Sequence, residues 1–101
     1  MDQKIQLRHP AGKKAVRIDK GKYERMKKAV LNSLKKKQEL SHTEILYAII
    51  EDFKKKKIKF EGSIEWYMES VKLDLEAGKW IERISDKTPQ KFRLGKRARD
   101  V

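Results

Sequence analysis

Lysine and arginine are the residues of this sequence best placed to do chemistry, and they gather in two groups. One is the unbroken run from Lys54 to Lys57, and the other lies toward the C-terminus. Ammonium and guanidinium groups donate charge-assisted hydrogen bonds to anionic oxygens, above all to those of phosphate groups. The two groups therefore favour non-covalent binding of a polyanion.

The overall composition points the same way. Lysine and arginine number 27 against 15 aspartates and glutamates, which gives a formal net charge of +12. This excess raises the local concentration of polyanions and speeds association with them. DNA, RNA, an anionic membrane surface or an acidic protein would all fit, and solubility alone is a further interpretation of so much lysine.

Catalytic and metal-binding patterns are weak. The sequence has no cysteine, and a turn and a helix start account for His9 and His42. Glu61, Glu65 and Glu69 are spaced by four residues, and we expect a neighbouring lysine rather than a metal as their counterion. A glycine-rich phosphate loop is lacking. We therefore expect no enzymatic activity, no metal and no cofactor, and no small-molecule ligand is evident.

Two amphipathic patterns predict the first helices that would position these cations. Tyr23, Met26, Val30 and Leu34 share one face of a helix from about Lys20 to Lys36, with Asp19 as its N-cap. A capping box, Ser41-His42-Thr43-Glu44, opens a second helix. Its broad apolar stripe is formed by Ile45, Leu46, Ile49, Ile50 and Phe53.

The rest of the chain predicts one more helix and two hairpins. The third helix covers about residues 63–77 and ends at Gly78. Strands at residues 80–84 and 91–94, joined by a turn at 86–89, form a C-terminal hairpin. Alternating residues within 3–18, broken by the turn-rich stretch 9–13, predict an N-terminal hairpin.

The junction Leu75-Glu76-Ala77-Gly78-Lys79-Trp80-Ile81-Glu82-Arg83 resembles the passage from third helix to wing in winged-helix domains, and Leu40-Ser41 resembles the pair before their second helix. The resemblance covers about residues 20–95. It implies an α+β, winged helix-turn-helix fold: a three-helix core with a C-terminal β-hairpin wing and, here, an extra N-terminal β-hairpin. We expect one domain over 1–95 (hairpin 3–18, helical core 20–78, wing 80–94) and a frayed basic tail over 96–101.

The whole chain is also similar to a group of small uncharacterised bacterial winged-helix proteins. In that group a third helix containing tryptophan ends in the run that stands here as Leu73-Asp74-Leu75-Glu76-Ala77. The similarity implies the same fold.

In winged-helix domains the third helix enters the major groove of DNA and the wing contacts the backbone. In this chain, however, residues 61–80 hold five carboxylates and two lysines, and are the only acidic segment. We therefore expect phosphate contacts to come mostly from the wing, the lysine run and the first helix, which supplies Arg25, Lys28, Lys35 and Lys36. The candidate nucleic-acid-binding residues are Lys54, Lys55, Lys56, Ser63, Lys72, Lys87, Lys91, Arg93, Lys96 and Arg97.

The outer face of the third helix suggests a different role. Trp66 and Leu73 lie seven residues apart beside Glu69, and would form an apolar patch with an acidic border. We expect this patch to be covered, either by the N-terminal hairpin or by a second chain. Trp66, Glu69 and Leu73 are therefore the candidate partner-binding residues.

The favoured interpretation is a DNA-binding winged-helix protein, a small transcriptional regulator that could act as a homodimer. The alternative is a protein-protein interaction module using Trp66, Leu73 and the acidic face of the third helix. Association with RNA or the ribosome is a third reading, ranked below DNA. No apolar run reaches the ~18 residues that span a bilayer, and no signal peptide is evident, so we expect no membrane partner and a cytoplasmic location.

Overall fold

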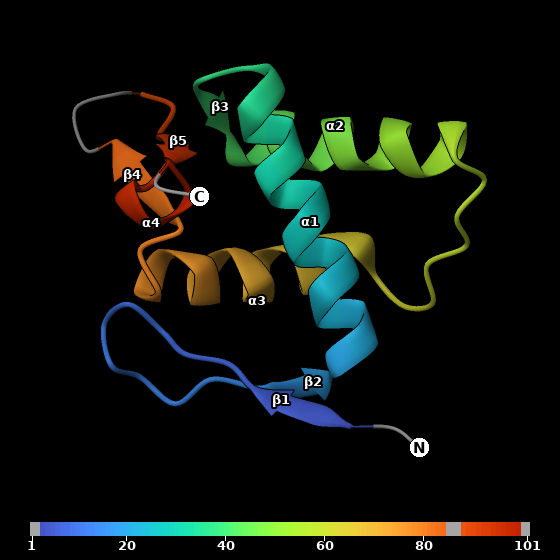
Figure 1. Cartoon of the computed structure of the whole chain (residues 1–101), viewed down its shortest axis with the longest axis horizontal. Helices are drawn as coiled ribbons and strands as arrows, with labels where there is room; N and C mark the ends of the chain where they lie inside the picture. Colours follow the sequence, from blue (N-terminus) through green and yellow to red (C-terminus); the bar gives the residue numbers. More distant parts are fainter. Residues whose placement is uncertain (1–2, 85–87, 100–101) are drawn as a thin grey trace.

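The computed structural model describes residues 3–84 and 88–99 of the chain. The elements, in chain order, are β1 (Lys4–Gln6), β2 (Arg17–Asp19), α1 (Lys20–Lys36), β3 (Leu40–Ser41), α2 (His42–Lys55), α3 (Ile64–Ala77), β4 (Ile81–Ile84), β5 (Lys91–Leu94) and α4 (Lys96–Arg99). In Figure 1, α1 crosses both α2 and α3, and the C-terminal hairpin lies at the opposite end of the molecule from the link between α2 and α3, residues 56–63.

Side-chain caps fix where the three long helices begin. The Asp19 carboxylate accepts a hydrogen bond from the Lys22 backbone N–H at 3.0 Å, and the Ser63 hydroxyl accepts one from the Trp66 N–H at 3.1 Å. Both halves of the capping box between Ser41 and Glu44 are formed. These caps satisfy N–H groups that a helix leaves unpaired in its first turn. The predicted positions of all three helices are confirmed.

A three-stranded antiparallel sheet, in the order β3-β5-β4, joins the wing to the helices. Ile81 pairs with Leu94 in the hairpin, and Leu40 pairs with Phe92 across β3 and β5. The sequence predicted the hairpin, but not the pairing of residues 40–41 with it. The α+β class is confirmed, and the order helix, strand, helix, helix, strand, strand is winged-helix-like, with the N-terminal hairpin as an addition.

Asp74 joins the N-terminal hairpin to the helical core. It is 4% exposed and accepts hydrogen bonds from the Arg8 backbone N–H at 2.8 Å and the Tyr23 hydroxyl at 2.7 Å. Burial, and then this hydrogen bond to Asp74, raise the pKa of Tyr23. Ile18 of β2 and Leu7 just after β1 are buried in the same core. One buried carboxylate thus ties together the hairpin, α1 and α3.

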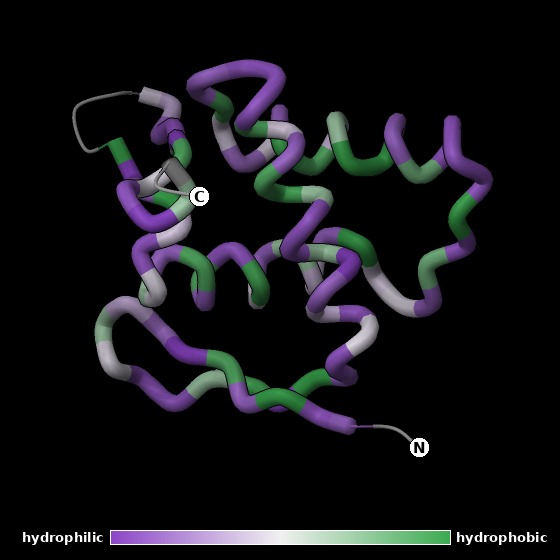
Figure 2. Tube along the Cα trace, in the orientation of Figure 1, coloured by the Kyte–Doolittle hydropathy of each residue, from purple (hydrophilic) through white to green (hydrophobic). Residues whose placement is uncertain are grey.

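One hydrophobic core joins apolar residues of all three long helices, β3 and both hairpins. Hydrophilic residues dominate the C-terminal end of α1 and the loop after it (Figure 2). No helix in the described part of the chain has both the length and the apolar character needed to cross a membrane. The fully buried side chains include Met26, Leu34, Ile45, Ile49, Met68, Leu75 and Ile81.

The basic segment after the wing differs from the expected frayed tail. Residues 96–99 form the short helix α4, and the Arg97 backbone N–H donates to the Lys79 carbonyl at 3.2 Å. The Arg97 guanidinium also lies 4.8 Å from the centre of the Trp80 ring. The chain approaches so closely here that a Cβ on Gly95 would clash with the Lys79 carbonyl. Residues 100–101 lie outside the described residues, as does part of the predicted 86–89 turn.

Candidate nucleic-acid interface

The outer face of α3 is acidic and partly apolar. Trp66 is 46% exposed, Glu65 and Glu69 are exposed, and Leu73 is half-buried. The N-terminal hairpin, one of the two expected covers of this patch, therefore leaves Trp66 exposed. Ser63 is the N-cap of α3, with its hydroxyl oxygen already accepting from the Trp66 N–H. If α3 entered a groove of DNA, the carboxylates on this face would repel the backbone phosphates.

Lys72, a candidate phosphate contact of the third helix, is nearly buried. Only 5% of the residue is exposed, and its ammonium nitrogen lies 3.9 Å from the centre of the Phe92 ring. Burial lowers the pKa of Lys72. The reason is the wing, which folds back over this flank of α3 and covers a position that a helix considered alone would expose. Lys72 is therefore not an exposed cation of the helix surface, and it meets solvent only at the depression that it lines.

The wing cations have partners within the chain. Arg93 Nε lies 3.0 Å from Glu82 Oε2, and Lys91 Nζ lies 3.8 Å from Glu44 Oε1. Lys96 is exposed, whereas Lys87 lies outside the described residues. Ion pairing reduces the charge that Lys91 and Arg93 present to a polyanion.

At the end of the molecule opposite the wing, the cations from the end of α2 to Lys59 are exposed. Of these described cations only Lys56 forms an ion pair, with Asp52 at 3.3 Å. Two depressions that share Gly21 and Arg25 run between α1, the end of α2 and the link. We call this region the α1–link surface. The exposed cations that line it without an ion pair in the described chain are Arg25, Lys28, Lys57 and Lys59. Lys54 and Lys55, exposed in the last turn of α2, line neither depression, and we count them with this surface because they adjoin it in the chain.

An aromatic ladder holds the link in place. The ring of Phe60 lies 5.8 Å from that of Phe53 and 5.2 Å from that of Tyr67, which in turn lies 4.9 Å from Trp66. Gly62 has a φ of 97°, and a Cβ there would lie 2.9 Å from the Tyr67 ring. The lysines of the link are therefore carried on an anchored segment.

The acidic residues of α3 do not use the expected counterion. Glu65 Oε2 lies 3.5 Å from His42 Nε2, and no lysine of the 54–57 run forms an ion pair with Glu61, Glu65 or Glu69 in the described chain. No group of three or more histidines and carboxylates in residues 3–84 and 88–99 could hold a metal ion.

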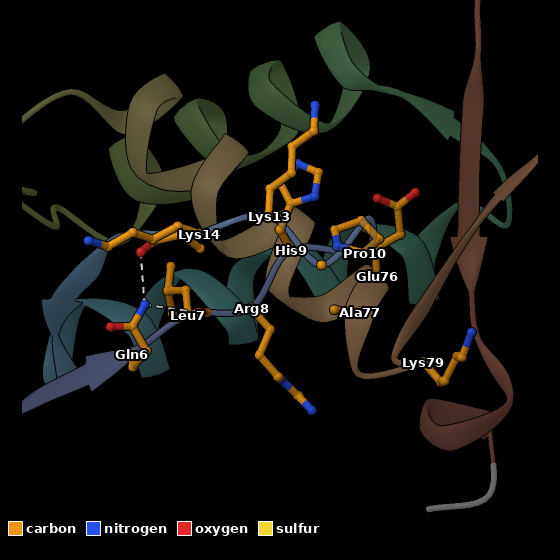
Figure 3. A pocket seen from close by; sticks show the side chains of 12 residues that line it. Gln6, Leu7, Arg8, His9, Pro10, Lys13, Lys14, Glu76, Ala77 and Lys79 are labelled. Atoms are coloured by element: carbon orange, nitrogen blue, oxygen red, sulfur yellow. Dashed lines mark hydrogen bonds between the residues drawn. The ribbon is translucent and has the colours of Figure 1, made fainter.

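A further basic depression lies between the N-terminal loop and the end of α3. Arg8, Lys13, Lys14 and Lys79 line it together with Glu76. Figure 3 shows the four cationic side chains pointing in different directions rather than toward one point. Glu76 is also already bound to Arg83, at 2.6 Å from Nε. This depression therefore lacks the convergent donors that one anion would need.

Comparison with known proteins gives one match. The model of a family of unknown function, DUF6958, matches residues 4–92. This range includes both hairpins, except for the last two residues of β5, and all three long helices. No curated protein and no solved structure matches the chain. The chain therefore belongs to the DUF6958 family of unknown function.

Proposed function

We propose that this protein binds nucleic acid, duplex DNA in preference to RNA, through backbone phosphates at the α1–link surface. The observation that carries the proposal is that cations of the wing are paired with carboxylates, whereas most cations of the α1–link surface are not. Asp19, Asp74 and Glu82 cap a helix, anchor the hairpin or pair with the wing. On the α1–link surface Asp52 pairs with Lys56, and Glu24 and Glu61 line the depressions, but the other exposed cations there have no ion pair in the described chain. Phosphate contacts give affinity without selecting a base sequence, which would suit a small accessory regulator.

Titration of a fluorescently labelled DNA duplex at low salt tests the proposal. Even non-specific binders reach dissociation constants of about 10⁻⁴ M or tighter, so weaker binding would exclude it. The variant Lys54→Glu/Lys55→Glu should weaken binding by at least about tenfold, because two cations beside the phosphates become anions. Competition with structured RNA would rank the two nucleic acids.

The matched control is Lys13→Glu/Lys14→Glu, which changes the net charge equally at exposed lysines of the N-terminal loop. This variant should bind much more tightly than the first. If both variants lose affinity equally, the α1–link surface has no special part in binding.

The exposed Trp66 supports a second candidate function, self-association. We infer that the acidic face around Trp66, Glu69 and Leu73 would dock on a second copy, because the rest of that copy is strongly basic. Sedimentation should show concentration-dependent association that Trp66→Ala abolishes. A strict monomer for both proteins would rule out this candidate and leave the first untouched.

A further inference from the structure

A shallow depression lies where the N-terminus of α2, the flank of α3 and the C-terminal hairpin meet. His42 and Thr43 of α2, Glu69 and Lys72 of α3, and Arg83 and Gln90 of the wing are among the residues that line it. Each of the three contributing regions supplies at least one hydrogen-bond donor. The depression thus differs from the N-terminal one, whose cations diverge.

The Lys72 ammonium is the unusual group in this depression. It packs on the Phe92 ring, yet no oxygen atom of the described chain accepts a hydrogen bond from it. Every fully buried side-chain nitrogen or oxygen among the described residues has a hydrogen-bond partner. The ammonium must therefore reach the surface, and the depression that Lys72 lines provides that opening. A nearly buried ammonium group lowers the stability of the fold unless an anion or a water molecule accepts its hydrogen bonds.

The N-terminus of α2 adds donors beside this cation. The capping box uses the backbone N–H of Ser41 and of Glu44. The N–H groups of His42 and Thr43 come first in the helix, so they have no intrahelical acceptor. No other backbone acceptor for them occurs in the described chain. The partial positive charge of the helix end favours an anion at this position.

The remaining charged groups limit what fits. Arg83 is neutralised by Glu76 and donates to the Gln90 side-chain oxygen at 3.0 Å, so it can contribute a donor but little net charge. Glu69 is exposed at the rim, and its carboxylate opposes an anion that sits high in the depression. These groups select a compact anion seated next to Lys72.

We propose that this depression binds a compact oxyanion, a phosphate group, between the Lys72 ammonium and the free amides of His42 and Thr43. The site is independent of the α1–link surface and does not require that the protein bind DNA. The phosphate could be free inorganic phosphate or part of a nucleic-acid backbone, and the two sources share the same donors.

Inorganic phosphate is the probe, followed by ¹H–¹⁵N spectra of the full chain. The His42 and Thr43 amide signals should shift in a saturable way. Lys72→Met keeps the apolar stem over Phe92 and should weaken phosphate binding about tenfold or more, the effect of losing a hydrogen bond between charged groups. Glu69→Gln should tighten it. Lys4→Met, which removes an exposed lysine of β1, should leave it unchanged.

Absence of saturable shifts at His42 and Thr43 up to about 10 mM phosphate would overturn the proposal, as would unchanged binding in Lys72→Met. Because Glu69 lies on the surface, Glu69→Gln keeps the test valid even if Lys72→Met unfolds. A duplex titration identifies the source. If Lys72→Met weakens DNA binding by the same factor, the phosphate belongs to the backbone; if DNA binding is unchanged, the ligand is a free phosphate.

Discussion

The wing and the α1–link surface are both basic in sequence, but the fold treats their charges differently. In the wing, Arg93 pairs with Glu82 and Lys91 with Glu44. On the α1–link surface, Lys54 and Lys55 face solvent without such partners in the described chain. The number of cations in a segment is therefore a poor guide to the charge it presents. What decides is whether tertiary structure brings a carboxylate alongside.

The largest expected difference between the two regions is in the salt dependence of DNA binding. Lys54→Ala/Lys55→Ala should reduce the slope of log K against log salt concentration by about 0.9 for each phosphate that the variant no longer neutralises. Lys91→Ala/Arg93→Ala should change the slope much less, because these cations are partly neutralised already. An equal reduction of the slope in both variants would show that the ion pairs of the wing open on binding.

A gain of affinity would sharpen the comparison further. Glu82→Gln removes the partner of Arg93 and releases its guanidinium. If a bound duplex extends from the α1–link surface to the wing, DNA binding should tighten severalfold at low salt. The gain should fade as salt is raised, because the added interaction is electrostatic. Fluorescence anisotropy at two salt concentrations would measure it, and unchanged affinity would show that the wing lies outside the interface.

The hydrogen bonds and cations around Glu44 predict that the stability of the folded state depends on pH. Hydrogen bonds from the Ser41 backbone and side chain, with a smaller effect of Lys91 and Lys37, lower the pKa of Glu44. A carboxyl with a lowered pKa stabilises the folded state above its unfolded pKa, and that stabilisation is lost as the pH falls through the folded pKa. Urea unfolding should therefore show a gap between wild type and Glu44→Gln at neutral pH that closes in acid. A gap of constant size would contradict this.

The smallest expected effect is on stability in the wing. Arg93→Ala removes an exposed ion pair, and such pairs contribute about 0.2–1 kcal/mol. Chemical unfolding should therefore show a change of no more than about 1 kcal/mol. A larger loss of stability would mean that the Arg93–Glu82 pair holds the hairpin in place, in addition to lowering its charge.

Local sequence determined the helices and the hairpins. The residues that define α1, from the Asp19 cap to the apolar face of Tyr23 and Val30, all lie within one element, so their spacing is enough to reveal it. The same holds for the capping box at Ser41. The functional expectation drawn from the net charge of +12 also needed no structure, and it stays a prediction.

Tertiary structure alone decided which of these charges are available. The pairing of Glu44 with Lys91, the β3–β5 pairing and the burial of Lys72 beneath the wing each join segments distant in the chain. Helical periodicity reports which face of an element is apolar, but not which neighbour will cover its other faces. For this reason the burial of Lys72 was not foreseen, and neither was it foreseen that the N-terminal hairpin would leave Trp66 46% exposed.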